Sequence, residues 1–123
     1  MFNNALNAYK SVEQKTLTGR EAEARVLTQA AQKLRACQKQ WEDGNHKVIL
    51  DDALKYNQRI WTILQVELAK PDNPLPDHIK RDLLLLSGFI DKRIFDTMAS
   101  PRPEKLDVII KINENIAAGL RGS

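Results

Sequence analysis

Few residues of this 123-residue chain have the type and spacing that catalysis or metal binding requires. Its two histidines, His46 and His78, lie near predicted helix starts, and neither is followed by a second histidine or a cysteine at the i+3 or i+4 spacing of a helical metal site. The adjacent acids Asp51 and Asp52 point in different directions on a helix, which does not suit an acid and base pair. No phosphate-binding glycine loop, nucleophile elbow or Cys/His pairing occurs. The sequence therefore predicts no catalytic residue, no metal and no cofactor, and a protein that is not an enzyme.

Charge is distributed along the whole chain. Lys and Arg number 19 and Asp and Glu 16, with the two signs interleaved in every segment, which is typical of a solvated surface and not of a nucleic-acid footprint. The single cysteine, Cys37, lies in an apolar stripe and excludes an intrachain disulfide framework, as expected for a reducing compartment. No signal-peptide pattern and no apolar run of about 20 residues occurs. We therefore expect a soluble, cytoplasmic protein without membrane contact.

Two asparagines interrupt the apolar pattern. Asn57 falls on an apolar stripe one turn before Trp61, and Asn113 lies near the middle of the stripe of the last predicted helix. A buried amide must find hydrogen-bond partners, either inside the fold or from a molecule that docks. Asn57 and Trp61 are therefore either a satisfied core amide beside a core indole or part of a groove that holds a partner helix. The same two interpretations apply to Asn113.

The elements that carry these residues are all predicted to be helices. Apolar residues recur every three or four positions, no strand-type alternation stands out, and glycine and proline lie between the periodic segments. Thr18 and Glu21 form a capping box that predicts a helix start, and Gly44 predicts the end of that helix. The predicted helices cover residues 3–16, 19–43, 46–70, 77–98 and 106–118.

Two of these helices have apolar residues on more than one side. Residues 53–68 carry two apolar stripes about 100° apart, so this helix needs neighbours on two sides. Residues 83–86 are apolar nearly all round the helix, which marks the helix 77–98 as a second central one. Since only Gly44 and Asn45 separate the second and third helices, these two are expected to form an antiparallel hairpin.

The N-terminal segment is the element with the least apolar surface. Residues 3–16 have one narrow stripe, so this helix can pack on the core or detach from it and be mobile. The expected fold class is all-α: a single-domain bundle of about five helices over residues 1–123, with two long central helices in an antiparallel hairpin.

Several stretches also match one protein family in order and spacing. They are Tyr9, Arg20-Glu21-Ala22-Glu23-Ala24, Asn57-Gln58-Arg59-Ile60-Trp61-Thr62, Asn73-Pro74-Leu75-Pro76, and Leu106 through Ile112-Asn113-Glu114-Asn115-Ile116-Ala117-Ala118-Gly119-Leu120. Over nearly its whole length the chain resembles the flagellar biosynthesis regulator FlaF of alphaproteobacteria. The resemblance implies a small cytoplasmic helical protein required for flagellin production and export, which acts as a flagellin chaperone and opposes a translational repressor called FlbT.

With flagellin as the implied cargo, we expect an apolar groove to hold one of its amphipathic terminal helices. The candidate partner-binding residues are apolar and amide side chains on the predicted helices: Tyr9, Asn57, Trp61, Phe89, Ile112, Asn113, Ile116 and Leu120. The possible partners are flagellin and the FlbT repressor, with direct nucleic-acid contact not expected.

Two other functions compete with this interpretation. One is an RNA-associated regulator that controls flagellin mRNA, with a phosphate-contacting face on one helix formed by Arg20, Arg25, Lys33, Arg35 and Lys39. Their angular spread is broad, and a solvated face explains them more simply. The other is a purely structural component that dimerises through its exposed stripes.

Overall fold

The computed structural model describes the backbone of residues 13–122 and the side chains of residues 21–122. This part of the chain is helical without strands, so the predicted all-α class is confirmed. Most of the predicted helix 3–16 lies outside the described residues. The elements are α2 (Glu13–Lys39), α3 (His46–Ala69), α4 (Asp77–Ala99), a 3-10 turn η1 (Pro103–Leu106) and α5 (Asp107–Gly122).

The start of α2 differs from the prediction. The described part of the helix runs from Glu13 through Thr18 and Glu21 without a break, so the predicted helix start at the capping box is wrong. A capping box stabilises a helix end only where the preceding chain leaves the helix. Here Gln14, Lys15 and Leu17 are good helix formers, and the helix simply extends.

The turns between the helices lie close to the predicted punctuation, but two helix ends differ from the prediction: α2 ends at Lys39 instead of residue 43, and α5 continues through Gly119 to Gly122 instead of ending at residue 118. The chain turns between α2 and α3 through Gln40–Asp43 and Asp43–His46 backbone hydrogen bonds of 3.0 and 3.1 Å. Asn45 takes the N-cap position of α3 but makes no side-chain capping bond. After α3, the Asn73 side chain donates to the Glu67 carbonyl at 3.0 Å and accepts the Leu75 N–H at 3.1 Å, which fixes the proline-rich turn before α4.

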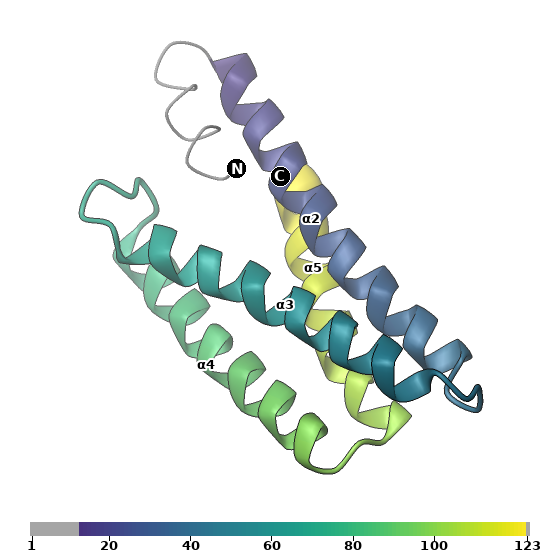
Figure 1. Ribbon diagram of the computed structural model, residues 1–123. Helices are drawn as coiled ribbons and strands as arrows, with labels where there is room; N and C mark the ends of the chain where they lie inside the picture. Colours follow the sequence, from purple (N-terminus) through teal and green to yellow (C-terminus); the bar gives the residue numbers. More distant parts are fainter. Residues whose placement is uncertain (1–12, 123) are drawn as a thin grey trace.

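Within residues 13–122, the α-helices form two pairs (Figure 1). Helix α5 lies along α2, and α4 lies along α3. The two pairs meet at the end of the molecule that contains the α2–α3 turn and η1, and they diverge toward the opposite end. Helix α3 therefore leaves α2 at an angle, and the helix that lies alongside α2 is α5 instead of its expected hairpin partner α3.

The core lies where these helices meet. It includes buried residues from every helix and from η1, among them Leu27, Leu34, Leu50, Leu54, Ile90, Ile94, Leu106 and Ile109. Helix α3 is central, as its two apolar stripes predict, because it contacts α2 on one side and α4 on the other. Among the described helices, none has the length and hydropathy needed to cross a membrane.

Candidate partner-binding surface

The two asparagines that interrupt the apolar pattern meet each other in the core. The Asn113 amide nitrogen donates to Asn57 Oδ1 at 2.6 Å, which joins α5 to α3. Asn57 Nδ2 donates to the Ala53 carbonyl at 2.9 Å in its own helix and to the Ala30 carbonyl at 3.2 Å in α2. Both asparagine side chains are fully buried. The pair therefore connects three helices through direct hydrogen bonds.

Trp61 completes this buried network. Its indole N–H donates to Asn113 Oδ1 at 2.9 Å, and its side chain is 0% exposed. Asn57 Oδ1, Asn113 Oδ1 and the indole N–H thus each have a partner inside the fold. Buried polar groups are costly unless they are paired, and here the pairing is internal.

The structure therefore decides between the two interpretations that the sequence left open. Asn57, Trp61 and Asn113 were candidate partner-binding residues, but the structure places all three in the core, and no partner can contact them in this conformation. The physical reason is that Asn113 forms hydrogen bonds with both Asn57 and Trp61, so these polar groups on apolar helix faces find their partners inside the fold. Sequence alone does not give the register that brings positions 56 residues apart to 2.6 Å.

The other candidate residues are distributed over two helices. Ile112, Ile116 and Leu120 are partly buried and pack against the edge of the core from one side of α5. Phe89 belongs to α4 and is 43% exposed. Tyr9 lies outside the described residues. The structure thus brings together the three α5 residues, and Phe89 belongs to a separate surface on α4.

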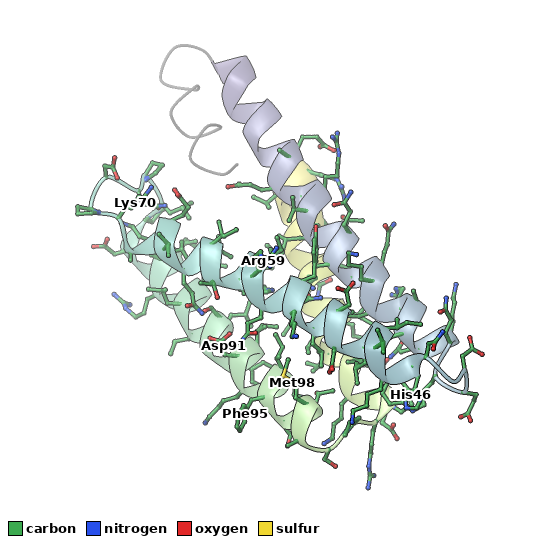
Figure 2. All side chains as sticks on the ribbon, viewed as in Figure 1. His46, Arg59, Lys70, Asp91, Phe95 and Met98 are labelled. Atoms are coloured by element: carbon green, nitrogen blue, oxygen red, sulfur yellow. The ribbon has the colours of Figure 1, made fainter. Side chains whose placement is uncertain are left out.

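That surface on α4 is the main apolar feature of the described chain. We call it the α4 surface, and it consists of Leu84, Leu85, Phe89, Phe95 and Met98. Phe95 and Leu85 are 76% and 69% exposed, and Figure 2 shows Phe95 pointing away from the other helices. Single exposed apolar residues are common, but several together on one helix indicate an interaction site.

The exposure of α4 corrects the prediction that this helix is central. Helix α4 packs on α3 and touches η1. On the α3 side, Gln65 Nε2 donates to Ser87 Oγ and, at 3.0 Å, to Asp91 Oδ2. The apolar run 83–86 that suggested burial on all sides has a neighbour on one side only. The sequence signal was correct in finding excess apolar surface, but it did not show which part stays uncovered.

Charged residues link α2 to α5 on the opposite side of the molecule. Arg35 donates to both carboxylate oxygens of Glu114, at 3.0 and 2.9 Å, and this pairing lowers the pKa of Glu114. Arg121 contacts Glu21 at 3.3 Å and donates to the Thr28 hydroxyl at 3.0 Å. These contacts hold α5 against α2 in a fixed register.

The same contacts engage part of the proposed phosphate-contacting face. Arg35 is bound by Glu114, and Lys33 Nζ lies 5.0 Å from the centre of the Tyr56 ring. The side chain of Arg20 lies outside the described ones, and two of the other four cations already have partners within the fold.

The only cysteine of the chain lies between α2 and α3. Cys37 is buried, and its thiol donates to the Ile49 carbonyl at 3.4 Å. Burial raises the pKa of the thiol, and the charge of Asp52 raises it further. Since thiol chemistry requires the thiolate, this position is that of a core residue, as its apolar stripe predicted.

The described residues form a small helical protein with an apolar core that encloses a hydrogen-bonded amide and indole network, and with one helix that exposes apolar side chains. The model of the family described as flagellar protein FlaF matches residues 5–120, and the chain belongs to that family. The resemblance seen in the sequence is thereby confirmed. Neither the comparison with curated proteins nor that with solved structures gives a significant match.

Proposed function

We propose that this flagellar protein binds flagellin in the cytoplasm as an export chaperone and takes part in regulating flagellin synthesis. The observation that carries the proposal is the α4 surface, where large apolar side chains remain exposed on a helix with one main neighbour. Family membership supplies the flagellar context. The proposed role is binding without catalysis.

The chemistry of the α4 surface suits a helical cargo. An amphipathic helix that cannot yet pack against its own assembly partners exposes an apolar stripe, and a second apolar helix surface can cover it. Covering such a stripe prevents aggregation of the monomer. Because cargo must be released for export, a moderate affinity serves this role better than a permanent complex.

The location of the proposed site differs from the groove expected around Asn57 and Trp61. Both side chains are buried, and each is hydrogen-bonded to Asn113. Of the candidate residues, Phe89 is part of the α4 surface, and Ile112, Ile116 and Leu120 lie at the edge of the core. The α4 surface is thus the site that we propose for the cargo.

Regulation can follow from the same binding event. If flagellin and the FlbT repressor bind this protein with coupled affinities, then occupancy by one changes the affinity for the other, and the effect is reciprocal. The amount of free flagellin would then be communicated to translation without any further enzyme.

The test is co-purification of the full chain with flagellin, intact and with each terminal segment of flagellin deleted. We expect the intact protein to bind and one of the two deletions to abolish binding. The apolar contacts of the α4 surface should keep most of their contribution as salt rises, whereas an interaction made mainly through the phosphates of an mRNA weakens steeply. Absence of binding to intact flagellin would refute the chaperone proposal.

A further inference from the structure

One glycine occupies the middle of the α4 surface. Gly88 is exposed, and a Cβ built at this position meets no atom within 4 Å. At about 100° per residue, Leu84 and Phe95 lie on one side of Gly88 around the helix, and Leu85 lies on the other. The two sets of large apolar side chains therefore flank a position without a side chain.

This glycine has no structural explanation within the described chain. Glycine inside a helix is destabilising relative to alanine, and the backbone at Gly88 is ordinary helix with negative φ. No neighbouring atom needs the space, so packing inside the protein does not require a glycine here. A glycine at the centre of an exposed apolar surface instead permits another backbone to approach closely.

Two cations lie on the same exposed side of α4. Arg81 is seven residues before Gly88 and Lys92 is four residues after it, so both share its side of the helix. Both are exposed, and neither forms an ion pair within residues 21–122. The nearby acid Asp96 is already paired with Lys105 of η1 at 3.1 Å. The α4 surface therefore presents two available positive charges beside its apolar residues.

We propose that an amphipathic helix with carboxylates beside its apolar stripe docks across α4 with its closest approach at Gly88. This inference rests on the proposed function, with flagellin as the protein that supplies the helix. Leu84, Leu85 and Phe95 receive the apolar stripe, and Arg81 and Lys92 pair with the carboxylates.

Gly88 and the charges favour this occupant over two others. A lipid surface gains nothing from a missing side chain, because it does not bring a backbone to a defined point. A second copy bound through the same face would place four cations in one symmetric interface, which like-charge repulsion disfavours.

The decisive experiment replaces Gly88 with larger residues that also have a higher helix propensity. Gly88→Ala and Gly88→Gln in the full chain should raise the melting temperature, since both residues have higher helix propensity than glycine. Affinity for purified monomeric flagellin should fall for Gly88→Ala and fall further, by roughly tenfold or more, for Gly88→Gln. The larger side chain keeps the backbone of the docked helix farther from α4. Binding is measured by isothermal titration calorimetry.

Gly119 provides the matched control. It also lies in a helix and is exposed, and a Cβ built there meets nothing within 4 Å. Gly119→Ala and Gly119→Gln should raise the melting temperature similarly and leave flagellin binding unchanged. If wild type binds flagellin and the Gly88 variants bind equally well, the docking site is wrong while the proposed function stands. If wild type does not bind flagellin, both are wrong.

Charge reversal tests the second half of the inference. Arg81→Glu with Lys92→Glu should weaken flagellin binding by roughly tenfold or more at low salt, with a smaller difference at high salt. Lys55→Glu with Arg59→Glu, on the exposed side of α3, makes the same change in net charge and should have little effect. Equal effects of the two pairs would overturn the carboxylate assignment.

The other occupants are tested with the same Gly88 and charge variants. Sedimentation with vesicles of phosphatidylglycerol and phosphatidylcholine measures lipid binding, and sedimentation velocity measures self-association. We expect neither vesicle binding nor a dimer that these variants disrupt. The inference would be overturned if the variants disrupted vesicle binding or a dimer while their affinity for flagellin stayed unchanged.

Discussion

Helices α4 and α5 are both apolar helices of similar kind, but they occupy very different environments. Helix α5 contacts α2 along its length, shares the buried amide network with α3, and is fixed by arginine contacts to α2. Helix α4 rests mainly on α3, and six of its large apolar side chains are exposed, five of which form the α4 surface. Excess apolar surface in a sequence therefore indicates that a helix needs neighbours, but it does not reveal whether those neighbours belong to the same chain.

The largest expected effect is a loss of folding stability when a side chain of the buried core is truncated. Trp61→Ala should lower the free energy of unfolding by about 3–5 kcal/mol, because it empties a fully buried site and leaves Asn113 Oδ1 without its indole donor. Denaturant unfolding followed by circular dichroism measures this change. Trp41→Ala, at a partly buried position at the edge of the core, should cost clearly less. Equal costs would mean that Trp61 does not have the buried position described.

Two adjacent residues of α4 sharpen the comparison within one helix. Ile94 is 1% exposed and Phe95 is 76% exposed. Ile94→Ala should destabilise the fold by about 2–5 kcal/mol, whereas Phe95→Ala should change stability by about 0.5 kcal/mol or less. The same unfolding measurement compares them. A large loss of stability for Phe95→Ala would show that α4 is covered within the chain, and the contrast between α4 and α5 would fail.

The buried hydrogen bonds have an intermediate expected effect. Trp61→Phe keeps most of the aromatic volume but removes the N–H that Asn113 Oδ1 accepts. Leaving a buried acceptor without its partner costs about 1–3 kcal/mol. Thermal unfolding of Trp61→Phe, compared with Trp41→Phe, isolates this contribution. If Trp61→Phe is as stable as wild type, the hydrogen bond from the indole N–H to Asn113 contributes nothing to folding stability.

The smallest expected effect belongs to the exposed ion pair on α5. The hydrogen bond from Arg35, with its charge, lowers the pKa of Glu114 in the folded protein. The stabilisation is therefore present above the unfolded pKa of the carboxyl and is lost as pH falls through its lower folded pKa. Glu114→Gln should remove this contribution, so the variant should differ slightly from wild type at pH 7 and low salt.

Thermal unfolding at pH 7 and pH 3 measures the difference between wild type and Glu114→Gln. The difference should shrink at the lower pH and also at high salt, because the pair is exposed and screened. A difference that is independent of both pH and salt would point to packing instead of charge.

Local sequence patterns predicted the helical class, the turn at Asn73 to Pro76, and the central position of α3. They failed at Thr18, where a capping signal predicted a helix start. Good helix formers precede this residue, and α2 continues through it. They also left Asn57 and Asn113 undecided, because pairing across 56 positions depends on the register of two helices and not on either one. The exposure of Phe95 was equally hidden, since a helical stripe has the same spacing whether it faces a core or a partner.

Cys37 provides a way to measure how often α2 and α3 separate. Its thiol is the only one in the chain, and it is buried between α2 and α3 with the Ile49 carbonyl as acceptor. A thiol reagent can therefore react only when α2 and α3 separate, so the labelling rate of the unmodified protein reports how often this opening occurs. Because α4 does not carry this thiol, labelling with and without flagellin would show whether docking on the exposed helix also slows the opening of the enclosed half.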